Sequence, residues 1–113
     1  MNENLISTVS HTIDIATMQG SAARACALMK VMANPDRLLL LCQLSQGEKA
    51  VGELEDILEI NQPTLSQQLT VLRDEGLVKT RRDGKRIYYS IASAKAMAVM
   101  QVLYQQFCQK DRS

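Results

Sequence analysis

Apolar residues recur every three or four positions along four successive stretches of the chain, and this period predicts four helices. The stretches cover residues 16–32, 35–44, 51–58 and 63–75. In the fourth stretch Leu65, Leu69 and Leu72 fall on one side, and Gln67 lies nearly opposite them. This stretch therefore predicts an amphipathic helix with a buried leucine face and an exposed polar face.

The ends of these stretches carry helix boundary signals. Asn34 is a favourable N-cap and Pro35 a favourable first-turn residue, so the second helix is predicted to begin there. Gly76 follows the fourth stretch, and helices commonly end on a glycine. The third helix is predicted to turn four apolar side chains inward: Val51, Leu54, Ile57 and Leu58.

After Gly76 the hydrophobic period changes to two, which predicts strands. The two strands cover residues 77–82 and 85–91, and Asp83-Gly84 between them is a strong signal for a two-residue hairpin turn. In the second strand Ile87, Tyr89 and Ile91 alternate with more polar residues. We therefore expect one buried and one exposed face on this strand.

A last helix is predicted from its N-cap, Ser93, to about Gln109. Its apolar residues cover more than one side: Met97, Met100, Val102, Leu103, Tyr104 and Phe107. A helix this apolar at the end of a small domain packs against a partner as well as against its own core. Together with the apolar first helix, it predicts a homodimer held through the first and last helices.

The length of 113 residues supports one domain with a modest core. We expect a flexible N-terminal tail over residues 1–15 and a single domain over residues 16–113. The formal net charge is +1, but the charges are unevenly distributed. Residues 72–89 hold six basic and three acidic residues, whereas residues 34–60 hold two basic and six acidic ones. That polarity predicts one face turned toward phosphate and another turned away.

Several classes of protein are disfavoured. The sequence has neither the pattern of a signal peptide nor a run long enough to cross a membrane, so we expect a cytoplasmic protein with no membrane partner. Its three cysteines are odd in number and widely spaced, which favours reduced thiols over a disulfide framework. Catalysis is not expected, because the sequence lacks paired acids, a histidine-based constellation and a Gly-rich phosphate loop.

The predicted order of four helices, two strands and a final helix is that of a winged helix-turn-helix, mainly α with a small β-hairpin. Its fourth helix offers amides and hydroxyls to base edges, and the basic hairpin suits phosphate or a narrow minor groove. We therefore predict that double-stranded DNA binds to Gln62, Thr64, Ser66, Gln67, Gln68, Arg81, Arg82, Lys85 and Arg86. The alternatives are a merely solvated helix face with charges that keep the hairpin soluble, and a winged helix used for protein assembly.

The motifs around these residues resemble those of the ArsR/SmtB-type winged-helix repressors. They are MANPDRL at residues 32–38, VGEL at 51–54, QPTLSQQL at 62–69, LRDEGLV at 72–78 and RIYYS at 86–90. The resemblance covers nearly all of the chain after the tail. It implies a homodimeric repressor that releases its operator DNA when an inducer is sensed.

The chain departs from this family at the metal sites. One common site needs a Cys-X-Cys pair in the helix before the recognition helix, and residues 51–57 contain no cysteine. Another uses histidine and acidic ligands on the last helix, where this chain has none before its final residues. The only histidine, His11, lies in the predicted tail. We therefore predict no metal site and no cofactor.

Two cysteines remain as sensing candidates, Cys42 in the second helix and Cys108 near the end of the last. The chain most resembles the persulfide-responsive branch of the family, the BigR- and SqrR-like regulators, which carry a cysteine in each of these helices. By that resemblance Cys42 and Cys108 are the redox-sensing thiols, and reactive sulfur species are the inducer that bridges them. Arsenite or another thiophilic metal, and oxidation by peroxide, are alternative inducers for the same repressor.

The residues themselves argue less strongly for sensing. Cys42 follows four consecutive leucines, where a cysteine is usually a small buried apolar residue. Cys108 has a more polar context with Lys110 nearby, which favours its thiolate. Cys26, in an alanine-rich helix, is predicted to serve packing.

Overall fold

The structure, a computed structural model, describes residues 14–108. The chain divides into two compact units, residues 1–30 and residues 31–113. Helix α2 (Ile15–Met32) begins one residue before the predicted start, where Asp14 accepts a hydrogen bond from the Thr17 amide at 2.8 Å. Most of the predicted tail, His11 included, lies outside the described residues.

Helix α3 (Pro35–Leu44) has the predicted bounds. The Asn34 side chain accepts a hydrogen bond from the Arg37 amide at 3.0 Å, which satisfies one of the free N–H groups of the first turn. The helix contacts α4 (Val51–Leu58), α5 (Thr64–Asp74) and the sheet, so it packs on three sides of the core of the second unit. Its fully buried residues are Leu40, Leu41 and Leu44.

The leucine face predicted for α5 is confirmed. Leu65, Leu69 and Leu72 are each no more than 1% exposed, and α5 contacts α3 and the first strand of the hairpin. Fully burying one leucine contributes roughly 1.5–3 kcal/mol, so this face fixes the rotation of α5 about its own axis. Its opposite side is left for solvent or a partner.

On α4 the inward orientation predicted for Ile57 is wrong, because its side chain is 50% exposed. Leu54 is fully buried and is the centre of the packed side. At helical spacing Val51 and Leu58 fall to one side of Leu54 and Ile57 falls to the other. The core lies on the first of these sides, where Val51 and Leu58 are half-buried.

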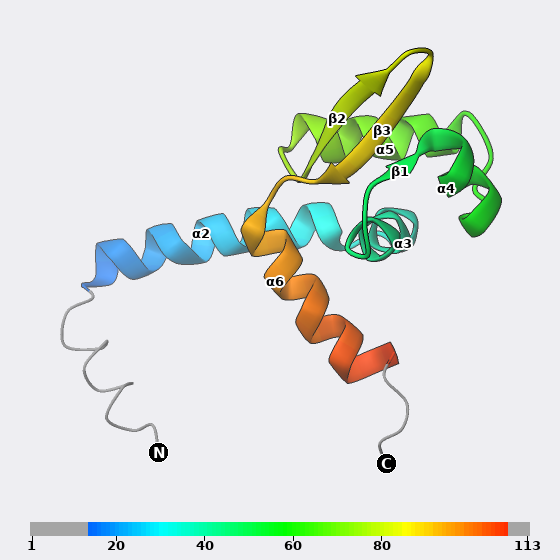
Figure 1. Cartoon of the computed structure of the whole chain (residues 1–113). Helices are drawn as coiled ribbons and strands as arrows, with labels where there is room; N and C mark the ends of the chain where they lie inside the picture. Colours follow the sequence, from blue (N-terminus) through cyan, green and yellow to red (C-terminus); the bar gives the residue numbers. More distant parts are fainter. Residues whose placement is uncertain (1–13, 109–113) are drawn as a thin grey trace. The chain divides into compact units, whose positions relative to one another are not determined.

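Three antiparallel strands form the sheet, in the order β1-β3-β2. Strands β2 (Val78–Asp83) and β3 (Arg86–Ile91) are the predicted hairpin, which confirms a winged helix-turn-helix. Strand β1 (Lys49–Ala50) pairs with β3 and was not predicted, because two residues have no period to detect. The hairpin extends beyond α5, with its tip away from the helices (Figure 1).

The hairpin turn falls one residue later than predicted. Asp83 pairs with Arg86, so Gly84 and Lys85 form the turn, and Gly84 has a φ of 65° that glycine adopts without strain. The buried and exposed faces predicted for β3 are also wrong. Ile87 is 36% exposed, and the other residues from Tyr88 to Ile91 are all half-buried, because the hairpin reaches past the core.

Helix α6 (Ala94–Leu103) begins as predicted, with Ser93 Oγ accepting a hydrogen bond from the Ala96 amide at 3.0 Å. It ends earlier than predicted, because the backbone continues as a π-helical segment, η1 (Tyr104–Cys108). Gln109, the predicted end, lies outside the described residues. Among residues 14–108, no helix combines the length and apolar character needed to cross a membrane.

Candidate functional site

The polar side of α5 begins with a pair of side chains that bind each other. Gln62 Oε1 accepts hydrogen bonds from the Ser66 amide at 3.1 Å and from the Ser66 hydroxyl at 2.6 Å. These bonds satisfy part of the first turn of α5, so both side chains hold the start of the helix in the DNA-free chain. Gln67 is exposed and Thr64 is half-buried. Contact of these four residues with DNA stays a prediction.

Gln68 is connected to α3. Its Oε1 accepts a hydrogen bond from the Arg37 guanidinium at 2.9 Å, and the same guanidinium donates through Nε to the Val31 carbonyl oxygen at 2.6 Å. Arg37 therefore joins the end of α2, the first turn of α3 and the exposed side of α5. The sequence placed Gln68 with the DNA-reading residues and gave Arg37 no role.

In the wing, the hairpin of β2 and β3, Arg81 is paired within the chain. Its guanidinium donates to both Glu48 carboxylate oxygens, at 2.8 and 2.9 Å, and lies 4.7 Å from the centre of the Tyr88 ring. The hydrogen bond from Arg81 is the main cause that lowers the pKa of Glu48. The charge of Arg81 is thus offset by a neighbouring carboxylate.

The other basic residues of the wing are more open to a partner. Arg82, Lys85 and Arg86 are exposed, and the Arg86 guanidinium lies 5.6 Å from the centre of the Tyr88 ring. Arg82 precedes the turn and Lys85 lies within it, so both lie near the tip. A positive hairpin tip beside a polar helix is an arrangement that suits phosphate and groove contacts.

A cavity of about 520 Å³ lies between α3 and the α6–η1 segment, and both candidate sensing thiols line it. Cys42 is half-buried and Cys108 is exposed, and neither forms a disulfide. The rest of the lining is almost entirely apolar: Pro35, Leu38, Leu39, Ser45, Met100, Leu103, Tyr104 and Phe107. The structure therefore brings together two cysteines that are far apart in the sequence.

The environment of Cys42 disfavours its charged form. Burial raises the pKa of the Cys42 thiol, and the negative charge of the Cys108 thiolate raises it further. At neutral pH Cys42 is consequently held as a thiol in an apolar setting. The exposed Cys108 is the thiol that a reagent in solution meets first.

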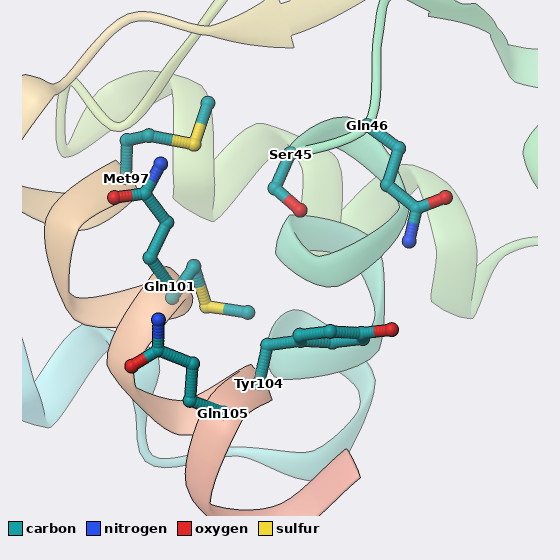
Figure 2. A pocket seen from close by; sticks show the side chains of 7 residues that line it. Ser45, Gln46, Met97, Gln101, Tyr104 and Gln105 are labelled. Carbon is teal, nitrogen blue, oxygen red and sulfur yellow. The ribbon is translucent and has the colours of Figure 1, made fainter. Parts of the chain in front are cut away.

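A second cavity of about 460 Å³ adjoins the first and shares Ser45, Met100 and Tyr104 with it. Figure 2 shows Ser45 and Gln46 on one side of it, and Met97, Gln101 and Gln105 on the other. Sequence reasoning missed this cavity. The available signal was the spacing of Gln101 and Gln105, four positions apart among mostly apolar residues.

Two further candidates can be placed. Cys26 is exposed on α2, so the packing role predicted for it is wrong within the single chain. No cluster of three or more histidine, cysteine or acidic side chains that could hold a metal ion occurs among residues 14–108. Lys110, which was expected to favour the Cys108 thiolate, lies outside the described residues.

The sequence pattern described as "Bacterial regulatory protein, arsR family" matches residues 34–80, which run from the cap of α3 into β2. The biofilm growth-associated repressor of Agrobacterium fabrum is 48% identical over 101 residues, covering 89% of this chain and 86% of that protein. The chain belongs to the arsR family. It is therefore a regulator of transcription built on a winged helix-turn-helix.

Solved structures agree with this arsR-family fold. The crystal structure of the transcriptional repressor BigR from Xylella fastidiosa has a TM-score of 0.79 and 44% identity, covering 88% of this chain and all of that one. The structure described as reduced HlyU from Vibrio cholerae also has a TM-score of 0.79, with 41% identity over 81% of this chain and 97% of that one. HlyU of that species is named a transcriptional activator, so arsR-family relatives of similar identity carry names of opposite sense.

Proposed function

We propose that this arsR-family protein is a dithiol-based repressor. In its reduced state it binds operator DNA as a homodimer, and reactive sulfur species release it by bridging Cys42 and Cys108. The observation that supports the proposal is the shared cavity, whose almost entirely apolar lining includes both cysteines. Three relatives named biofilm growth-associated repressors, and a neighbour solved in a reduced state, support it.

The chemistry needs a sulfur donor, which is a persulfide of the form RSSH. A cysteine thiolate attacks the outer sulfur, the S–S bond of RSSH breaks, and RSH is returned while the protein keeps one added sulfur. Repetition extends the chain on the cysteine. The other thiolate then attacks the extended chain, and the terminal sulfur leaves as hydrogen sulfide. Three RSSH molecules thus give a bridge of four sulfur atoms, three RSH and one hydrogen sulfide.

Closing this bridge would act on DNA binding through α3. Cys42 lies on α3, which contacts α5 directly and is joined to it by the Arg37–Gln68 hydrogen bond. Tying α3 to η1 shifts the support on which the recognition helix rests. In a dimer the two recognition helices must meet half-sites about 34 Å apart, so a small shift lowers operator affinity.

A homodimer is part of the proposal. Val102 is 55% and Phe107 81% exposed on the α6–η1 segment, and on α2 Ile15 and Met18 are 69% and 56% exposed. On each of these helices, large exposed apolar side chains are typical of a surface that a second copy covers. A dimer would also present two recognition helices, as an operator with two half-sites requires.

The experiment combines mass and DNA binding. A duplex is selected from a random pool by the reduced protein, and the protein is then treated with glutathione persulfide. We expect a mass gain of two sulfur atoms less two hydrogens, together with loss of duplex binding. Both effects should disappear in Cys42→Ser and in Cys108→Ser and persist in the matched control Cys26→Ser.

The other outcomes would lead to different conclusions. Retained release in both Cys42→Ser and Cys108→Ser would refute dithiol sensing and leave the DNA-binding assignment in place. Release by arsenite or by peroxide, without any sulfur bridge, would assign the same cavity to one of those inducers. A duplex affinity that does not fall with added salt would instead favour a protein-assembly module.

A further inference from the structure

Two cavities of different chemistry adjoin each other where Ser45, Met100 and Tyr104 line both. The thiol cavity is almost entirely apolar, whereas its neighbour combines the apolar Met97 and Met100 with the amides of Gln46, Gln101 and Gln105 and the hydroxyls of Ser45 and Tyr104. We call this neighbour the polar cavity, since it holds five hydrogen-bonding side chains. A molecule that lies across the boundary therefore meets apolar side chains and sulfur at one end and hydrogen-bonding groups at the other.

We propose that the polar cavity binds the organic part of the persulfide, so the inducer is a small cysteine derivative with amide and carboxylate groups. This inference rests on the proposed function and deepens it by naming the class of sulfur donor. An inorganic polysulfide has no organic part and gains nothing from this cavity. The cavity thus gives the sensor a preference between two sources of sulfur.

The lining matches that ligand class. A primary amide offers two hydrogen-bond donors and an acceptor, and a hydroxyl can donate or accept. The five polar side chains can therefore form hydrogen bonds with both peptide groups and carboxylates. All side chains that line the cavity are neutral, which suits a ligand with charges of both signs. The volume of about 460 Å³ falls within the range usual for small-molecule sites, roughly 300–1,000 Å³.

The position of the cavity also suits the chemistry. With its organic part between α3 and α6, the persulfide directs its outer sulfur past Tyr104 toward the apolar lining that holds Cys42 and Cys108. The exposed Cys108 thiolate attacks that sulfur, the S–S bond breaks, and the thiolate RS⁻ remains on the polar side until it takes a proton and leaves as RSH. Holding the reactants together in this way raises the rate of transfer.

The first experiment measures the rate of bridging with two sulfur donors. The Gln101→Leu/Gln105→Leu variant should react roughly tenfold more slowly than the wild type with glutathione persulfide, since each lost hydrogen bond reduces binding several-fold. Its rate with inorganic tetrasulfide should stay unchanged. The matched control is Gln106→Leu, an exposed glutamine of η1 that lines neither cavity, and it should behave as the wild type with both donors.

A second measurement does not depend on bridging. S-methylglutathione carries the same organic part without a transferable sulfur, and NMR titration of the reduced protein should shift the side-chain NH₂ signals of Gln101 and Gln105. Absence of these shifts, or an equal slowing with both sulfur donors, would overturn the inference. Clear shifts in a protein that no donor can bridge would keep the binding site and refute only the proposed sensing function.

Discussion

Arg81 and Arg82 are neighbours of the same type with different surroundings. Arg81 is held by Glu48 and stacked on Tyr88, whereas Arg82 is exposed near the wing tip. An exposed ion pair contributes little to stability, but a two-point bond to a carboxylate fixes where a side chain lies. Arg81 therefore orients the wing on the segment before β1, and Arg82 is the better phosphate ligand.

Replacing Arg82 with alanine is expected to weaken duplex binding and to reduce the slope of log K against log salt by about one, because one fewer counterion is released. Replacing Arg81 should reduce the slope less, since Glu48 already offsets its charge. Fluorescence anisotropy with a labelled duplex across a salt series measures both. Equal reductions would mean that DNA displaces Glu48 from Arg81.

Cys42 should titrate above an ordinary thiol, because burial and the Cys108 charge raise its pKa. Alkylation by iodoacetamide requires the thiolate, so its rate at Cys42 should keep rising with pH past about 8.5, the ordinary midpoint. Peptide mapping by mass spectrometry measures the rate at Cys42 alone. Cys108→Ser should lower the midpoint and still leave it above that of the urea-unfolded chain. A midpoint in the folded protein equal to that of the unfolded chain would contradict the burial of this thiol.

For single residues, the sequence predicted exposed polar surfaces better than it predicted the contacts of each side chain. It assigned both Arg81 and Gln68 to a DNA-binding surface. It had no means to pair them with Glu48 and Arg37, each roughly thirty residues away, because such contacts exist only once the elements have packed. The polar lining of Gln101 and Gln105 was missed for the same reason.

Among the elements, α3 links the recognition helix to the thiol cavity. It packs its leucines against α5, joins the same helix through Arg37, and supplies Cys42 to the thiol cavity. The apolar contact sets the distance between the helices and the rotation of α5, and the Arg37–Gln68 hydrogen bond adds one directional link between them. We therefore expect a change on the cavity side of α3 to be passed to the polar side of α5.

The Arg37–Gln68 bond should be measurable as a coupling between two helices. In urea unfolding, Arg37→Ala and Gln68→Ala are expected to be non-additive by about 0.5–1.5 kcal/mol, the usual contribution of a part-buried hydrogen bond. Gln67→Ala, on the exposed side of α5, serves as the control and should fall within about 0.5 kcal/mol of the wild type. Additive losses for Arg37 and Gln68 would show that the bond contributes nothing to the packing of α3 on α5.

Local signals explain which elements were predicted well. The bounds of α3 and the start of α6 were correct, because Asn34, Pro35 and Ser93 are boundary residues in any context. The hairpin turn was misplaced by one residue, since register depends on which residues pair across β2 and β3. Strand β1 and the π-helical segment η1 have two and five residues, and segments this short have no periodic pattern by which the sequence could predict them.

For the whole molecule, the unpaired apolar surface of α6 and η1 predicts a dimer. Val102→Glu places a charge among side chains that a second copy should cover, and it is expected to convert the protein to a monomer with weaker operator binding. Ile57→Glu is the matched control and should stay dimeric, because Ile57 is a comparably exposed apolar residue of α4 that lies outside the α6–η1 surface. Light scattering after size exclusion gives the mass directly. A monomeric wild type, or a dimer that survives Val102→Glu, would contradict the prediction.

The position of α3 between α5 and the thiol cavity has a consequence for how such regulators diversify. The residues predicted to read DNA at the start of α5, Gln62, Thr64, Ser66 and Gln67, line neither cavity, so each set can change while the other is kept. A related regulator could therefore change the operator sequence that it binds without changing its inducer, or change its inducer without changing its operator. Gln68 is the exception, because it is joined to Arg37. Biosensors assembled by exchanging recognition residues between relatives should therefore conserve that one position.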